Sequence, residues 1–140
     1  MALGNWPLQT AIAVLLKADA GIKALVGPTT ARVYDAVPED APVTFPYITI
    51  GDMTVADQSS FGDQDGGVYL VDIHSWSRYR GRKELRNIMS AIHTALHRVT
   101  LTVSGYNHAG SMFESQNDLT EQDGLTRHGI QRFRITMQTT

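Results

Sequence analysis

The chain has 140 residues, of which 42% are hydrophobic, with a net charge of −2 at pH 7 and no cysteine. This length suits a single domain, residues 1–140, with a core of its own. The absence of cysteine excludes disulfides, thiolate catalysis and cysteine-based zinc sites, and it favours a reducing compartment. A net charge so close to zero gives no general attraction to nucleic acid, so we expect no specific nucleic-acid binding.

The distribution of apolar residues argues against a membrane protein. The longest apolar run, residues 11–16, is far shorter than the roughly 20 residues that cross a bilayer. No charged segment leads into an apolar one at the amino terminus. We therefore expect neither a signal peptide nor a membrane anchor.

Helices come first in the chain and short strands follow. Pro7 suits the first turn of a helix, and apolar residues at helical spacing predict this helix over residues 7–17. A second short helix is expected over residues 19–26, before a Gly-Pro pair. Residues 32–37 and 47–50, which are rich in β-branched and aromatic side chains, read as short strands.

Residues 68–76 form the most informative expected strand. The polar stretch before it, residues 51–67, reads as a long hairpin connection. Alternate side chains of a strand point to opposite faces, and neither face of this one is cleanly polar. It is expected to be covered on both faces, either by two layers of one protomer or by a second subunit on one side. The first face carries Tyr69, Val71 and Ile73, and the second carries Val68, Leu70, His74 and Trp76.

The segment after Gly81 predicts an amphipathic helix. Its apolar residues fall on one helical stripe, while most of its charged residues lie off that stripe, so it should cover one face of a sheet. The stripe consists of Leu85, Ile88, Met89, Ile92 and Leu96.

Strands close the chain. The β-branched residues 99–103 read as a strand, and residues 106–114 and 127–138 as a strand pair across the Asp123-Gly124 turn. The expected fold class is therefore α+β: a mostly antiparallel sheet with an amino-terminal helix and one central amphipathic helix packed on it.

Charge is segregated along the chain. Residues 33–77 contain no Lys or Arg, residues 78–98 are mainly basic, and the charged residues of 114–123 are acidic. Separate acidic and basic zones allow identical subunits to meet head to tail, although they can equally be neighbours within one protomer or simply solvated. The candidate contact residues are Arg78, Arg80, Arg82 and Lys83 on the basic side and Asp57, Asp63, Asp65, Glu121 and Asp123 on the acidic side.

Four residues offer parts of a metal site without the rest of an active site. His93 and His97 are four apart on a helix, the spacing of two ligands that share a metal, and Asp72 and His74 point the same way on their strand. No nucleophile, phosphate loop or further ligand accompanies them. We interpret the two helical histidines as exposed and Asp72 with His74 as a hydrogen-bonded pair, and we predict no enzyme activity, metal or cofactor. A small metal-dependent hydrolase using all four residues is the alternative from another functional class.

An ordered series of loose patterns covers most of the chain. It runs through Ala24-Leu25-Val26-Gly27, Arg32-Val33-Tyr34, Phe45-Pro46-Tyr47-Ile48-Thr49-Ile50-Gly51, Val71-Asp72-Ile73-His74-Ser75-Trp76-Ser77, the helix from Gly81, and residues 129–135 after Asp123-Gly124. In this order the chain resembles the tail terminator, or tail-completion, proteins of bacteriophages, prophages and gene transfer agents. Ser75 departs from the pattern, which has a larger apolar residue there.

The resemblance implies a structural protein of virion assembly that is not an enzyme. Such proteins form a homohexameric ring on the completed tail tube, end its polymerisation and provide the surface that joins the tail to the head connector. The implied partners are further copies of the chain, the major tail tube protein and a head-tail connector or stopper protein. The implied place is the tail-head junction of a virion or phage-like particle assembled in the bacterial cytoplasm. A head-side completion protein of the neck is the alternative within this class.

Overall fold

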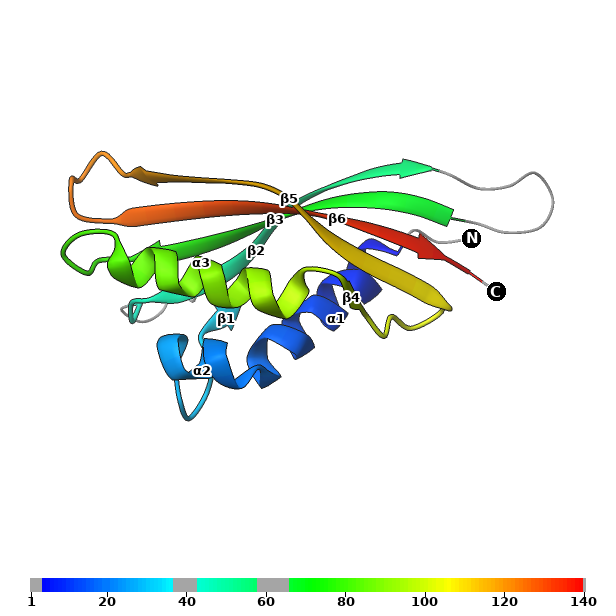
Figure 1. The fold of residues 1–140 in the computed structure, drawn as a ribbon, viewed down its shortest axis with the longest axis horizontal. Coiled ribbons are helices and arrows are strands. Elements are labelled where there is room, and N and C mark those ends of the chain that lie inside the picture. The colour runs from blue at the N-terminus through cyan, green and yellow to red at the C-terminus, as the bar shows by residue number, and fades with distance from the viewer. Residues whose placement is uncertain (1–3, 37–42, 58–65, 140) are drawn as a thin grey trace.

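A six-stranded sheet with three helices on one face makes up the molecule (Figure 1). The computed structural model describes residues 4–36, 43–57 and 66–139. The strand order is β1-β2-β3-β6-β5-β4; β1 is parallel to β2 and the other neighbouring strands are antiparallel. The α+β prediction is confirmed. The elements are α1 (Asn5–Ala18), α2 (Ala20–Val26), β1 (Val33–Tyr34), β2 (Tyr47–Asp57), β3 (Gly66–Ser77), α3 (Lys83–Leu96), β4 (Val99–Thr100), β5 (His108–Thr120) and β6 (Arg127–Gln138).

Strand β3 lies in the middle of the sheet, and its burial alternates without a break. Tyr69, Val71 and Ile73 are buried against the helices, together with the apolar stripe of α3 that the sequence predicts. The residues between them on β3 are half-buried on the opposite face, which no described helix covers. A second covering layer within the protomer is therefore absent from the described part of the chain.

Helix α3 approaches β6 closely at one point. A Cβ added to Gly129 would lie 2.5 Å from Sδ of Met89, so any larger residue there would require this side chain to shift. Beside this contact, the buried side chain of Gln131 donates through Nε2 to the carbonyl oxygen of Met89 at 2.8 Å. The two features position the polar face of α3 next to the hairpin of β5 and β6.

The strand boundaries differ from the sequence-based ones at several strands. Residues 51–57 and 66–67, expected to belong to a connection, are part of β2 and β3, with an irregularity in register between Ile50 and Met53. Main-chain hydrogen bonds form whatever the polarity of the side chains, so the β2–β3 pair extends into this polar sequence. Of residues 99–103, only Val99–Thr100 pairs as a strand, whereas β5 continues to Thr120. Asp63 and Asp65 lie outside the described residues.

In the part of the chain that the structure describes, no helix combines the length and the apolar character needed to cross a bilayer.

Candidate functional site

The basic turn, residues 78–82 between β3 and α3, lies beside the tip of the β5–β6 hairpin (Figure 1). Arg78 donates from Nε to Oγ1 of Thr126 at 3.1 Å, and its Nη2 lies 3.9 Å from Oδ2 of Asp123. The same guanidinium lies over the ring of Phe45, 4.3 Å from the ring centre. Arg78 is therefore held by its own protomer.

A second cluster joins the turn and α3 to β5. Asp118 accepts from Nη1 of Arg82 at 3.1 Å and from Nε of Arg86 at 2.9 Å. The hydrogen bond from Arg86 is the main cause that lowers the pKa of Asp118, and the charges of Arg86 and Arg82 act in the same direction. Sequence reasoning missed Arg86 and Asp118 as partners, because a contact between a helix and a strand so far along the chain needs the register of the sheet.

Two basic residues of the predicted contact set remain on the surface. Arg80 and Lys83 are exposed, and the described residues form no ion pair with either. Tyr79, which directly precedes Arg80, is 55% exposed. This surface of the basic turn and the start of α3 is available to another molecule.

The predicted acidic residues lie in two different places. Glu121 and Asp123 are at the hairpin tip, next to the basic turn, and both have partners in the protomer. Asp123 accepts from the backbone N–H groups of Thr126 and Leu125 and from the Thr126 hydroxyl, and these bonds lower its pKa to about 2. Asp57 is exposed at the other end of the sheet, where β2 pairs with the first residues of β3. The acidic and basic zones are thus brought together at the hairpin tip and separated at Asp57.

The proposed pairing of Asp72 with His74 is wrong. Asp72 accepts from Nε of Arg132 at 3.0 Å, and Nδ1 of His74 lies 2.7 Å from Nε2 of His128. Alternate residues of a strand share a face, but the neighbouring strand β6 offers each of them a closer partner. The sequence gives no signal for these two pairs without the β3–β6 register.

The interpretation of His93 and His97 as simply exposed is also wrong. Both are half-buried, their rings stack with centres 4.7 Å apart, and Nδ1 of His97 accepts the backbone N–H of Phe113 at 3.1 Å. A neutral His97 that accepts at Nδ1 carries its proton on Nε2, so neither ring nitrogen is free for a metal. Among the described residues, no group of three or more His, Cys, Asp or Glu is arranged to hold a metal ion.

The four residues of the hydrolase alternative do not converge. Asp72 and His74 point from the open face of the sheet, whereas His93 and His97 lie on α3, which covers the other face. A site that needs all four would have to cross the sheet. The described structure therefore does not bring this candidate constellation together.

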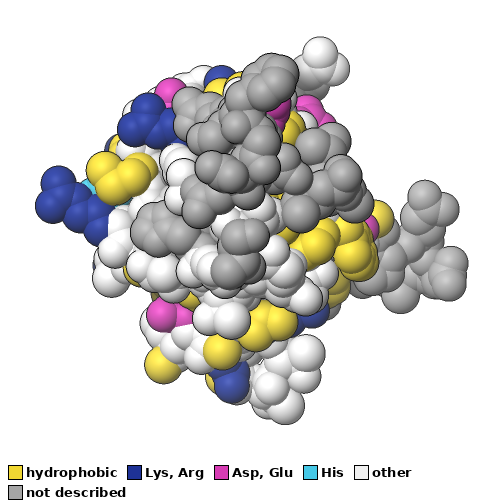
Figure 2. Space-filling view, turned by 90° about the vertical axis from the view of Figure 1, so that its right-hand side faces the viewer, with side chains coloured by type: hydrophobic (Ala, Val, Ile, Leu, Met, Phe, Trp, Pro, Cys, Tyr) yellow, Lys and Arg dark blue, Asp and Glu magenta, His cyan; other side chains and the backbone are white. Residues whose placement is uncertain are grey.

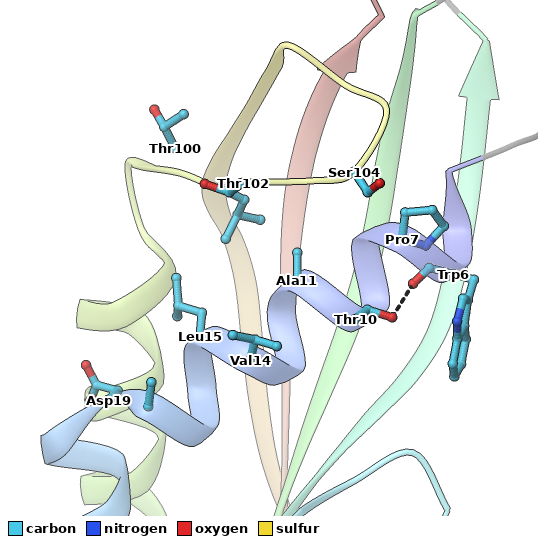
Figure 3. A pocket seen from close by; sticks show the side chains of 12 residues that line it. Trp6, Pro7, Thr10, Ala11, Val14, Leu15, Asp19, Thr100, Thr102 and Ser104 are labelled. Carbon is cyan, nitrogen blue, oxygen red and sulfur yellow. Dashed lines mark hydrogen bonds between the residues drawn. The ribbon is translucent and has the colours of Figure 1, made fainter.

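An apolar groove runs along α1, and sequence reasoning did not identify it. It has a volume of about 920 Å³ and lies between α1 and residues 100–104 (Figure 3). On its rim, Trp6 is 66% and Val14 is 63% exposed, although α1 buries its other face in the core. The end of the molecule that carries the chain termini likewise shows separate apolar patches, with Lys and Arg mainly at the margins of the view (Figure 2). The exposed apolar side chains along this groove are available for burial against another molecule.

Comparisons with known proteins match this chain to proteins of viral and virus-like particles. The family model described as tail completion protein gp17 matches residues 10–138. The tail completion protein gp17 of Bacillus phage SPP1 is 30% identical over 96 residues, which are 66% of this chain and 68% of that protein. A chain from the virion of a native gene transfer agent particle has the same fold with a TM-score of 0.89, 28% identity and 99% coverage of both chains. The chain therefore belongs to the tail completion protein gp17 family.

Proposed function

We propose that the protein forms a closed ring of identical subunits on the finished tail tube, ends tube polymerisation and provides the surface that meets the head connector. The match of the family model over residues 10–138 carries this proposal. The shared fold with a chain of a gene transfer agent virion supports a place in the particle, at the junction of tail and head. By resemblance the ring is hexameric.

Several separate surfaces of the protomer support an assembly role. The open face of the sheet, the exposed apolar groove of α1 and the exposed Arg80 and Lys83 all offer surface to other molecules. A structural role also fits a chain whose candidate catalytic residues lie on opposite faces of the sheet.

The contact between subunits is proposed to join opposite ends of the sheet. A ring needs two different surfaces on each subunit, since the contact is head to tail. The exposed Arg80 and Lys83 lie at one end, and Asp57 lies at the other, near Asp63 and Asp65 in the sequence. Glu121 and Asp123 are less suited as partners in a head-to-tail contact, because they lie at the hairpin tip, at the same end of the sheet as the basic turn.

Charge reversal tests this arrangement. Arg80→Glu with Lys83→Glu should abolish capping of tail tubes while the circular dichroism spectrum and the unfolding midpoint stay close to those of the natural chain. Cross-subunit pairs that are partly buried can contribute on the order of 1.5 kcal/mol or more, whereas exposed pairs give about 0–1 kcal/mol. Because ring closure repeats the contact at every interface, the effect on assembly should be large.

Two further variants make the result specific. Lys17→Glu with Lys23→Glu causes the same change of net charge on α1 and α2 and should leave capping intact. Adding Asp57→Arg to the Arg80 and Lys83 reversals should partly restore capping. If the Arg80 and Lys83 reversals cap tubes at normal efficiency, the basic turn is not the contact. Binding of the purified protein to a head connector but not to tail tubes would instead support a head-side neck protein.

A further inference from the structure

A hydrogen-bonded network of three polar side chains links the tip of the β5–β6 hairpin to the middle of the sheet. Nδ1 of His74 lies 2.7 Å from Nε2 of His128, and Nδ1 of His128 lies 2.8 Å from Oε1 of Glu121. His128 is only 9% exposed, and its ring stacks flat on Trp76 with centres 3.7 Å apart and an angle of 9°. His74 lies on β3, His128 lies on β6, and Glu121 directly follows β5, so this hydrogen-bonded network joins the hairpin tip to two strands.

The number of protons on the two imidazoles decides whether this hydrogen-bonded network can form. A carboxylate only accepts, so Nδ1–H of His128 donates to Glu121. In the neutral pair, Nε2 of His128 accepts from Nδ1–H of His74. One added proton keeps the bond, because one of the two facing nitrogens can still accept.

A second added proton removes the bond. Both facing nitrogens, on His74 and His128, then carry hydrogen, and neither can accept from the other. Two cations would also face each other with ring centres 5.0 Å apart. The hydrogen-bonded network therefore cannot form when both imidazoles are cationic.

The surrounding groups act on the pKa of His74 in opposite directions. They do not change the number of protons that the hydrogen bond between the two imidazoles tolerates. Burial is the main cause that lowers the pKa of His74, the charge of His128 adds to it, and Asp72 and Asp52 act in the opposite direction. Asp72 is itself paired with Arg132, which reduces its effect. The titratable and charged groups around the pair are Tyr47 and Asp52 from β2, Asp72 from β3, Arg132 from β6, Glu121 after β5, and Arg78 beyond Tyr47.

We propose that His74, His128 and Glu121 form a proton-operated latch, which holds the hairpin tip while the pair carries at most one extra proton and releases it when both imidazoles are cationic. Residues 121–126 form the tip, and Asp123 and Thr126 within it hold Arg78 of the basic turn. Release of the tip therefore also loosens the basic turn. The latch is a property of the protomer and does not depend on the proposed ring.

Hydrogen exchange with imidazole NMR tests the latch in the full chain. The imidazole signals of the pair report how many protons it carries as the pH is lowered from about 8 to about 4. Protection factors at residues 121–126 should fall by about tenfold or more with the second added proton, while core amides of β3 and β6 stay protected. Protection factors at the tip that stay constant over this range would overturn the proposal.

Two variants separate the latch from general acid sensitivity. His128→Phe keeps a ring on Trp76 but cannot bind a proton, and His74→Asn removes the second cation while leaving a side chain that can donate or accept. In either variant, protection at residues 121–126 should no longer depend on pH in this range. His93→Asn, on the other face of the sheet, should behave like the natural chain. If the tip still opens in acid in the folded variants His128→Phe and His74→Asn, the latch is wrong, and either variant decides this if the other fails to fold.

Discussion

Sδ of Met89 occupies the space that a side chain at Gly129 would need. A Cβ at Gly129 would come within 2.5 Å of this sulfur and 3.2 Å of Met89 Cγ, while Met89 itself is 2% exposed. The contact fixes the distance between α3 and β6, and through it the place of the basic turn beside the hairpin. An added methyl group in so tight a contact should be costly, because a close-packed core cannot move freely.

Gly129→Ala should lower the free energy of unfolding by about 1–3 kcal/mol, the usual cost of overpacking. Met89→Ala removes the obstructing side chain, so the double variant should be more stable than the sum of the two single effects predicts. Urea unfolding of the four proteins measures this coupling. A coupling energy of zero would show that Met89 does not set the limit at Gly129.

The two buried serines of β3 should respond differently to replacement by alanine. Oγ of Ser75 is buried and has no hydrogen-bond partner among the described residues, whereas Oγ of Ser77 donates to Glu84 at 2.7 Å and accepts from the backbone N–H of Tyr79 at 3.1 Å. Ser75→Ala should change stability by less than about 0.5 kcal/mol or raise it, and Ser77→Ala should lower it by about 1–2 kcal/mol. Equal losses in thermal unfolding would contradict this assignment.

His97 should make stability depend on pH. Partial burial is the main cause that lowers its pKa, and His93 and Arg98 act in the same direction. The folded chain therefore binds this proton less readily than the unfolded chain, so its contribution is present above the ordinary histidine pKa of about 6.5 and is lost as the pH falls below it.

The urea midpoint between about pH 7.5 and about pH 5.5 should consequently fall more for the natural chain than for His97→Gln. The glutamine oxygen can still accept the N–H of Phe113, whereas His97→Ala leaves this group without its partner. His97→Ala should therefore be the less stable of the two at neutral pH. Identical midpoints for the two variants would mean that the bond to Phe113 contributes nothing.

Asp123 should hold the hairpin tip down to strongly acidic pH. Its pKa of about 2 lies below the ordinary value, so its contribution is present above the ordinary aspartate pKa and is lost as the pH falls through about 2. Asp123→Asn should reduce the amide protection of Leu125 and Thr126 already at neutral pH. Opening of the natural tip in milder acid cannot then come from Asp123, which separates this residue from the histidine latch. Unchanged amide protection of Leu125 and Thr126 in Asp123→Asn would show that Asp123 does not stabilise the turn.

Periodic features of the sequence predict much of this fold. The stripe of α3 depends only on which residues must face a core, and it lies where it was expected. The second face of β3 was expected to be covered like the first, whereas in the protomer it is half-buried and no described helix covers it. The strand at residues 51–57 was missed because main-chain pairing continues through polar residues.

The candidate site was less predictable because it depends on register. Arg86 with Asp118, and His74 with His128, become neighbours only once the strands are aligned. Charge segregation singled out the basic turn as a candidate contact, but it could not show that Asp123 lies beside Arg78 in the same protomer. Only the exposed Arg80 and Lys83 are left as basic candidates for a subunit contact.

Cryo-electron microscopy of tails purified from producing cells tests the central claim most directly. The account predicts a terminal ring at the head-facing end of the tube, with density in each subunit that fits this sheet and its three helices, and with Arg80 and Lys83 facing the Asp57 end of the next subunit. Tails made without the protein should lack the ring and vary in length. A different protein in the terminal ring, or tubes of normal length without this one, would contradict the account.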